Sequence, residues 1–170
     1  RRYVIDFRDK PEDRCRSKWP ELMTLLERKV KPERMKNNRD AYRQYWWHHG
    51  EKRPGLYKAV ELVSRVLVTC RHQSNFAFAS LPPGPVFAES LTVIALNEFA
   101  MLQSRCHELW SRFLGSSLGD GLRYTPTDCF ETFPFPTALR DSAANETAHQ
   151  ATRLGLEAIG ERYQQFRAEL

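Results

Sequence analysis

The sequence predicts an α+β fold, in which helices flank a small antiparallel sheet and a helical segment ends the chain. Short runs rich in β-branched and aromatic residues occur between residues 66 and 96, with Pro and Gly between them. Apolar residues recur at helical spacing on both sides of that region. Of the 170 residues, 41% are apolar and 12% aromatic, which favours a folded core over disorder.

The N-terminal part is expected to begin with a strand and continue as helices. Residues 2–7 form an alternating, β-rich run, which predicts the strand. A short polar helix is predicted over 11–18. A second helix should begin at Trp19 and Pro20 and end at Pro32. Its apolar face is predicted from residues at helical spacing: Leu22, Leu25, Leu26 and Val30.

An aromatic and basic cluster interrupts the otherwise polar segment 34–53. Its rings are Tyr42, Tyr45, Trp46 and Trp47. One interpretation is a surface that stacks on bases and contacts phosphates. The other is structural, with Tyr42, Tyr45 and Trp46 anchoring a helix onto the core while the basic residues face water. No carboxylate or cysteine lies at ligand spacing from His48 and His49, so no metal site is expected.

The sheet is predicted from the middle of the chain, after a short helix over 56–63. We expect strands at 66–69, 76–78, 86–87 and 91–96, with the polar residues 71–75 forming the end of a hairpin. Asn97 should cap a long helix from 98 to 114. Its buried stripe is predicted as Phe99, Leu102, Cys106, Leu109, Trp110 and Phe113, with His107 beside it as a structural histidine.

A stiff aromatic segment, residues 122–136, follows a glycine-containing loop over 115–121. Thr125 and Pro126 fit the N-cap and first position of a short helix, and Asp128 is its third residue. Prolines at 134 and 136 then force an extended path. Three rings should press this segment onto the core: Phe130, Phe133 and Phe135.

The last helix is expected to begin at Asn145 or Glu146 and to reach the end of the chain. Its apolar residues follow a coiled-coil spacing: Leu156, Ile159, Tyr163, Phe166 and Leu170. The partner helix could lie within this chain or outside it. Because the pattern stops in mid-repeat and the chain does not begin with Met, we expect a piece of a longer protein.

Charge is concentrated in one segment. The chain carries a net charge of +5, and residues 28–58 contain ten Lys and Arg against three Asp and Glu. Such a segment favours an acidic polymer, phosphates first, as the partner; a solvated helical face is the alternative. The four cysteines form no C-x-x-C pair, which suggests free buried thiols in a cytoplasmic protein, and no apolar run is long enough to span a membrane.

Motifs for catalysis are absent from the sequence. It contains no G-x-G-x-x-G, G-x-x-x-x-G-K-[ST], G-x-S-x-G or H-E-x-x-H pattern, and no convincing acidic cluster of a nuclease. We therefore expect no catalytic residue in this chain. Two polar loops, 71–75 and 116–123, carry side chains that suit base edges in DNA, although each could be an ordinary turn.

Several uncommon motifs, taken in order, resemble a known family. They are Arg2–Phe7 (RYVIDF), Val30–Arg34 (VKPER), Tyr42–Trp47 (YRQYWW), Leu102–Ser104 (LQS), His107–Trp110 (HELW), Leu122–Thr125 (LRYT) and Phe130–Pro136 (FETFPFP). Together they resemble the C-terminal part of bacterial DNA adenine methyltransferases. The nearest group is the type IIG/IIL, MmeI-like restriction–modification enzymes and related phage-defence methylases.

The resemblance implies a target recognition domain over 1–136 followed by a C-terminal helical segment over 137–170. It implies that the methyltransferase domain lies upstream in the same chain and that S-adenosylmethionine binds there, with no cofactor in this part. The family reads bases shortly before the Arg-Tyr-[Ser/Thr] motif, which here corresponds to Leu118–Gly121. The Gly-Asp-Gly found there departs from the charged pairs expected.

Taken together, these observations predict sequence-specific recognition of duplex DNA for adenine-N6 methylation. Phosphate contacts are predicted for four residues: Arg39, Arg43, Lys52 and Arg53. Base or groove contacts are predicted for seven others: Arg71, Gln73, Asn75, Ser116, Ser117, Asp120 and Arg123. The alternative is a non-catalytic interaction module that docks a neighbouring domain or subunit through its heptad helix.

Overall fold

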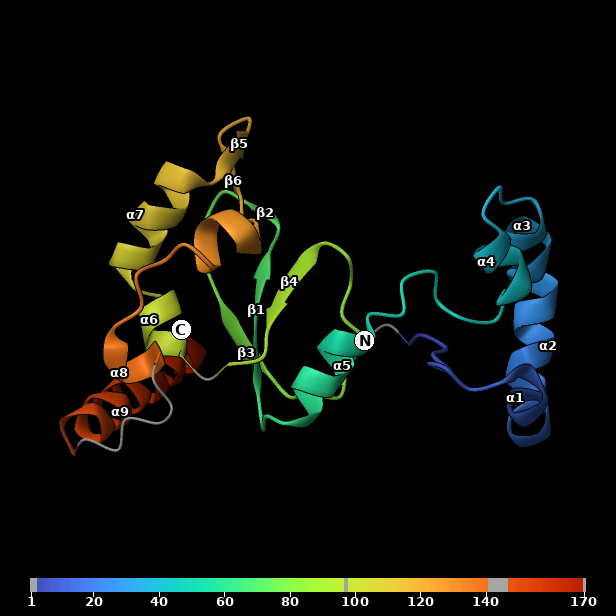
Figure 1. Ribbon diagram of the computed structural model, residues 1–170, viewed down its shortest axis with the longest axis horizontal. Coiled ribbons are helices and arrows are strands. Elements are labelled where there is room, and N and C mark those ends of the chain that lie inside the picture. Colours follow the sequence, from blue (N-terminus) through green and yellow to red (C-terminus); the bar gives the residue numbers. More distant parts are fainter. Residues whose placement is uncertain (1–2, 97, 141–146, 170) are drawn as a thin grey trace. The chain divides into compact units, whose positions relative to one another are not determined.

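The computed structural model describes residues 3–96, 98–140 and 147–169, and it confirms the α+β fold (Figure 1). The chain forms two compact units, Arg1–Tyr57 and Lys58–Leu170, here called unit 1 and unit 2. Helices make up the regular structure of unit 1, whereas unit 2 contains two small antiparallel sheets and further helices.

Unit 1 contains α1 (Glu12–Lys18), α2 (Pro20–Lys29), α3 (Lys31–Met35), α4 (Asp40–Gln44) and the first residues of α5 (Pro54–Glu61). The helices predicted at 11–18 and from 19–20 are thus confirmed. Pro32 does not end a helix, because it lies in the first turn of α3, where a missing N–H costs no hydrogen bond. The predicted face of α2 was partly wrong: Met23 is buried, while Leu22 and Leu25 are exposed.

The core of unit 1 gathers residues far apart in the sequence. It consists of Phe7, Cys15, Met23 and Trp46. The strand predicted at 2–7 is wrong for the described residues 3–7, which have no regular structure. All strands in the described part of the chain lie within 66–123, so this run has no strand to pair with, and Phe7 instead stacks on Trp19 with ring centroids 5.5 Å apart.

The first sheet of unit 2 has β1 (Val66–Cys70) at its centre, antiparallel to β3 (Ala79–Leu81) and β4 (Leu91–Ile94). Leu67 pairs with Ser80 on one side and with Ile94 on the other. The first four residues of β1 are all buried, which fits a run of β-branched and aliphatic residues without alternation. The strands predicted at 66–69 and within 91–96 are confirmed.

The strands predicted at 76–78 and 86–87 are wrong. A side chain, not a strand, satisfies the backbone of 76–78. Gln103 Oε1 accepts from the N–H of Phe78 at 2.8 Å, and its Nε2 donates to the carbonyl of Phe76 at 3.3 Å. Residues 86–87 directly follow Pro82, Pro83 and Pro85, which supply no ladder donors, and have no regular structure.

The second sheet contains β2 (His72–Gln73), β6 (Gly121–Arg123) and β5 (Ser116–Leu118) in that order, all antiparallel. The backbone of Arg71 joins the two sheets. Its N–H donates to Ser90 at 2.8 Å, and its carbonyl accepts from the N–H of Tyr124 at 2.8 Å. Both segments predicted as polar loops therefore contain paired strands.

The long helix predicted over 98–114 is divided into α6 (Phe99–Leu102) and α7 (Arg105–Leu114); its expected cap, Asn97, lies outside the described residues. Ser104 has an extended backbone and its hydroxyl accepts from the N–H of His107, so it caps a new helix. The new start changes the buried face. Cys106, Leu109 and Phe113 are exposed, contrary to prediction, whereas His107 and Ser111 are buried.

The aromatic segment after β6 has the predicted form. A short helical turn, η1 (Pro126–Phe130), has Thr125 at its N-cap position and Pro126 as its first residue. The Thr125 hydroxyl donates to the Asp128 carboxylate at 2.6 Å. Phe133 is buried, and its ring lies 5.0 Å from that of Phe135 between centroids, so this segment is packed onto the core.

The chain continues through α8 (Thr137–Arg140) to α9 (Thr147–Glu169), which confirms the last helix; the predicted start at 145–146 and Leu170 lie outside the described residues. α9 lies beside α6, with Gly160 buried at the contact (Figure 1). A Cβ at Gly160 would lie 3.4 Å from the Ala100 nitrogen. Most of the heptad residues face outward, since Ile159, Tyr163 and Phe166 are exposed.

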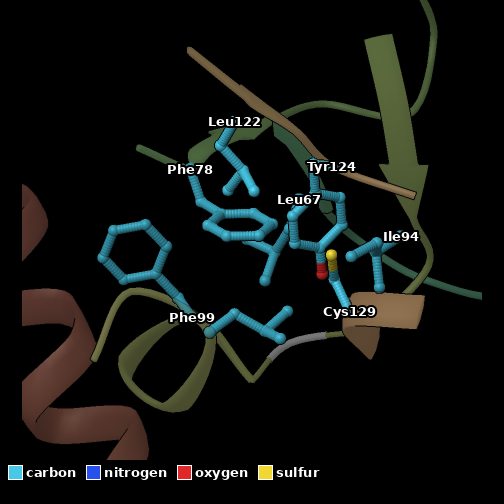
Figure 2. Packing of buried hydrophobic residues seen from close by; sticks show 8 residues of the cluster. Leu67, Phe78, Ile94, Phe99, Leu122, Tyr124 and Cys129 are labelled. Atoms are coloured by element: carbon cyan, nitrogen blue, oxygen red, sulfur yellow. The ribbon is translucent and has the colours of Figure 1, made fainter. Parts of the chain in front are cut away.

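The core of unit 2 draws on both sheets, α6 and η1. Figure 2 shows Leu67 and Ile94 of the first sheet meeting Leu122 and Tyr124 from β6 and its end. The remaining members of the cluster are Phe78, Phe99, Leu102 and Cys129.

The cysteines and helices of the described chain bear on two further expectations. All four cysteines are free, but only Cys15 and Cys129 are buried, so the prediction of buried thiols was wrong for Cys70 and Cys106. No helix in the described residues is both long and apolar enough to cross a membrane.

Leu67→Ala should lower the free energy of unfolding of unit 2 by about 2–5 kcal/mol, because it leaves a cavity among fully buried side chains. Leu62→Ala is the matched control: Leu62 is 87% exposed, so its loss should change stability by less than about 0.5 kcal/mol. Urea unfolding followed by circular dichroism measures both. Equal stabilities for the two variants would contradict this core.

Candidate functional site

The second sheet brings together the two segments from which base contacts were predicted. Residues 71–75 contribute β2, residues 116–123 contribute β5 and β6, and β6 lies between the other two strands. Residues directly opposite each other in an antiparallel pair lie on the same face. His72, Arg123 and Ser116 therefore form a row across the three strands, and all three are exposed.

The next row across this sheet faces the core at its centre. Gln73 and Ser117 lie opposite Leu122, which is buried. The sheet thus has an apolar core-facing side, and its exposed side is polar at His72, Arg123 and Ser116. We call this row of three residues the outer row.

Arg123 places a cationic group, unpaired within the described residues, on the exposed side of this sheet. Its guanidinium forms no ion pair or hydrogen bond with any described residue. At the end of the hairpin, Gly119 has φ +60°, a conformation that favours glycine, and the neighbouring Asp120 is exposed. A shallow hollow of about 120 Å³ lies beside the hairpin and is lined by Arg112, Gly115, Ser116, Ser117, Asp120, Gly121 and Leu122.

The three candidates on the β2 side differ in how their side chains are held. Gln73 donates through Nε2 to the Thr69 hydroxyl at 3.0 Å and accepts from the N–H of Ala77 at 3.3 Å, so its amide closes the turn after β1. Arg71 lies 4.0 Å from Glu89 as a loose ion pair. Asn75 is exposed.

Sequence reasoning missed His72, the exposed member of β2. It selected Arg71, Gln73 and Asn75, which alternate with His72. The buried residues Leu122 and Tyr124 carried the missing signal. They lie on either side of Arg123 in the sequence, so Arg123 points to the opposite, outer face. His72 pairs directly with Arg123 and therefore lies on the same outer face.

Behind the second sheet, α7 supports β6 with a buried histidine. His107 Nδ1 lies 2.9 Å from the Leu102 carbonyl, and Nε2 lies 3.3 Å from the Tyr124 hydroxyl and 3.2 Å from the Cys129 carbonyl. Burial lowers the pKa of His107, although the two carbonyls oppose this shift. The ring thus lies within hydrogen-bonding distance of two carbonyls and the Tyr124 hydroxyl, as expected for the structural histidine predicted.

The predicted phosphate contacts all lie in unit 1, and two of them lie over aromatic rings. Arg39 lies over the ring of Tyr42 at 5.5 Å, and Lys52 over that of Tyr45 at 4.8 Å. Lys52 also pairs with Asp9 at 3.0 Å, and Arg43 pairs with Asp40. Arg53 has φ +45°, which is uncommon for a residue with a side chain.

The structural interpretation of the aromatic cluster holds for Trp46 but not for Tyr45. Trp46 is buried in the core, and Trp47 donates through Nε1 to the Lys10 carbonyl at 3.0 Å, as the structural interpretation requires. Tyr45 does not anchor a helix, because it is 41% exposed and stacks on His48 at 5.8 Å. Since the helix α4 ends at Gln44, Tyr45 to Trp47 follow a turn and not a helical face.

Among the described residues, no three or more His, Cys, Asp or Glu side chains lie together in a group that could hold a metal ion. A family model described as "MmeI, target recognition domain" matches residues 1–137. No curated protein and no solved structure matches the chain.

Gly115→Ala should lower the stability of unit 2 by about 1–3 kcal/mol. Its Cβ would lie 2.5 Å from the Ser111 carbonyl oxygen and 2.8 Å from Leu122 Cδ1, at the junction of α7 and β5. Gly155→Ala in α9 is the control, since nothing lies within 4 Å of that Cβ and alanine favours a helix. Thermal unfolding measures both; a stable Gly115→Ala variant would contradict the tight junction.

Stability should fall on acidification below about pH 6.5, the usual pKa of histidine. The folded chain keeps His107 neutral because its pKa is lowered, while the unfolded chain takes up a proton there. Stability is therefore full above pH 6.5 and is lost as the pH falls towards the folded pKa, with a slope of at most about 1.4 kcal/mol per pH unit for this group.

Urea unfolding at pH 7.5, 6.5 and 5.5 measures this dependence, and His107→Phe provides the comparison. Glu98 is half-buried, and this burial together with the charge of Glu157 raises its pKa. Because a raised carboxylate pKa acts in the opposite direction, the Glu98→Gln background isolates the histidine. An unchanged slope in His107→Phe would show that other groups cause the acid sensitivity.

Proposed function

This chain belongs to the family of MmeI target recognition domains over residues 1–137, and we propose that it reads duplex DNA for a methyltransferase domain that modifies adenine at N6. Membership of the family gives the chain a role in DNA binding and sequence recognition in restriction–modification. The finer proposal names the residues that read bases, the residues that contact phosphates, and the methylation of adenine at N6 as the reaction that this recognition supports.

The observation that carries the proposal is the joining of both polar segments in one small sheet. The sheet presents donors and acceptors at short spacing on its exposed side: His72, Arg123 and Ser116 across the strands, and Asp120 at the hairpin end. A two-stranded ribbon fits the major groove of DNA. There Arg pairs with guanine O6 and N7, Asp accepts from cytosine N4, and Ser pairs with any base.

The β2 side is assigned a smaller part in base contact. The Gln73 amide would have to break two internal hydrogen bonds before it could pair with adenine. We therefore assign the base contacts first to Arg123, Asp120 and Ser116, with His72 added, and keep Arg71, Asn75 and Ser117 as groove contacts.

The phosphate contacts are assigned to unit 1. It holds sixteen Lys and Arg against nine Asp and Glu, while unit 2 has ten against twelve. Arg39, Arg43, Lys52 and Arg53 are held by rings, acids or a constrained backbone. This arrangement keeps cationic groups at fixed places, as contacts to successive phosphates require.

Methylation itself is assigned to a domain upstream of this chain. S-adenosylmethionine would bind there, as the resemblance to MmeI-like enzymes implies. A recognition domain over 1–136 with a helical segment over 137–170, a bacterial cytoplasmic setting and a part in phage defence stay predictions.

A specific observation favours docking as a second function. Three heptad residues of α9 are exposed, with Ile159 at 58%. An apolar stripe of this kind is typical of a helix that pairs with another protein surface. Docking of a neighbouring domain is compatible with DNA recognition. If the chain shows no salt-sensitive DNA binding, docking remains as its one proposed function.

Arg123→Ala should relax the base preference at one position of the bound sequence, at a cost of about 1–3 kcal/mol in discrimination. Selection of bound duplexes from a random-sequence pool, followed by sequencing, measures the preference. Arg162→Ala on α9 is the matched control, since it removes an exposed arginine far from the second sheet in sequence and should leave the preference unchanged.

Replacing Arg39, Arg43, Lys52 and Arg53 with Ala should weaken binding to all sequences alike and reduce the salt dependence of affinity.

The adenine assignment is tested by mapping N6-methyladenine made by a protein that carries this chain after a methyltransferase domain. Methylation of another base, or of the same sites after Arg123→Ala, would overturn the corresponding part of the proposal.

A further inference from the structure

Two side chains of helix α7 contact the residues that follow β2 and β6: Arg112 contacts Ser74, and His107 contacts Tyr124. We propose that His107 and Arg112 are positioning residues that fix β6 and the turn after β2 relative to each other, and so set base discrimination. The inference rests on the proposed function. Neither side chain is assigned a base contact, and both act through the strands that they hold.

His107 fixes the end of β6. Its Nε2 lies 3.3 Å from the hydroxyl of Tyr124, the residue directly after Arg123. Four aromatic rings pack around the imidazole, those of Phe76, Phe78, Tyr124 and Phe133. The imidazole ring is fully buried, so it cannot turn towards water, and the Tyr124 hydroxyl has a fixed hydrogen-bond partner.

Tyr124 transmits this constraint to the neighbouring segment. Its backbone N–H donates to the Arg71 carbonyl at 2.8 Å, directly beside His72. Arg123 and His72, two members of the outer row, are therefore each adjacent to one end of the same hydrogen bond. A displaced Tyr124 would shift both of them together.

Arg112 fixes the turn after β2 from the outer side of α7. Its Nη2 donates to the Ser74 carbonyl at 3.3 Å, and its Nε donates to Glu108 at 2.9 Å. Glu108 also accepts from Arg105 at 2.7 Å, so the carboxylate orients the guanidinium from within the helix. This arrangement requires a planar fork with several donors, which lysine lacks.

Base recognition is sensitive to such support, because paired donors and acceptors must meet a base edge within about 0.5 Å. β2 has two residues and β6 has three, so few ladder hydrogen bonds fix their spacing. The side chains of α7 supply the additional constraints.

The test uses Tyr124→Phe and Arg112→Lys in the full chain. Each is conservative: the first removes one buried hydroxyl, and the second keeps the positive charge. The affinity for the duplex selected by the wild-type chain is compared with that for a scrambled duplex of equal length, at several salt concentrations. Thermal unfolding verifies that each variant is folded.

Each variant should lower the ratio of the two affinities by about three- to tenfold, the usual effect of one hydrogen bond. Binding to the scrambled duplex and its salt dependence should stay as in the wild type. Thr132→Val is the matched control. It removes the hydrogen bond from Trp110 of α7 to the Thr132 hydroxyl, 3.0 Å long, without touching β2 or β6, and the ratio should not change.

Three results would overturn the inference. An unchanged ratio in both folded variants would show that α7 does not set discrimination. An equal loss of both affinities in Arg112→Lys would make Arg112 a contact to the DNA backbone and not a positioning residue. If the wild-type chain itself selects no sequence, the proposed function fails and this inference with it; selection by the wild type with unchanged variants removes the inference alone.

Discussion

Every buried backbone amide and carbonyl needs a hydrogen-bond partner, and this requirement governs unit 2. Its strands have two to five residues, so their ladders satisfy few of these groups. Side chains supply further partners. Gln103 pairs with the backbone of Phe76 and Phe78, and the Thr69 hydroxyl donates to the Ala77 carbonyl at 2.8 Å. His107 lies within hydrogen-bonding distance of the carbonyls of Leu102 and Cys129.

The same requirement explains why α7 buries His107, whereas the buried hydroxyl of Ser111 has no hydrogen-bond partner among the described residues. His107 and Ser111 point into the core, while Leu109 and Phe113, which is 84% exposed, point outward. A helix chosen only for apolar burial would have the reverse orientation. Here the helix begins at its Ser104 cap, which orients His107 towards β6 and η1.

Charge and base-edge chemistry are separated along the chain. Unit 1 carries most of the positive charge and packs it against aromatic rings, whereas unit 2 carries the small sheet with its outer row. A target recognition domain needs both properties, because phosphate contacts give affinity and base edges give sequence preference.

The sequence by itself determined the fold class, the central strand β1, the last helix and the aromatic segment after β6. These follow from local patterns: aliphatic runs, helical spacing, and Pro126 directly after Thr125. It also placed candidate residues on two segments that the second sheet brings together, since Arg123, Asp120 and Ser116 lie on that sheet or its hairpin end. The tertiary structure decided what depends on distant partners. It paired His72 and Gln73 with Arg123 and Leu122, exposed His72, engaged the Gln73 amide in internal hydrogen bonds, and left the described residues 3–7 and 76–78 irregular where strands were predicted. A strand or a buried histidine needs a partner far along the chain, and local sequence patterns do not identify that partner.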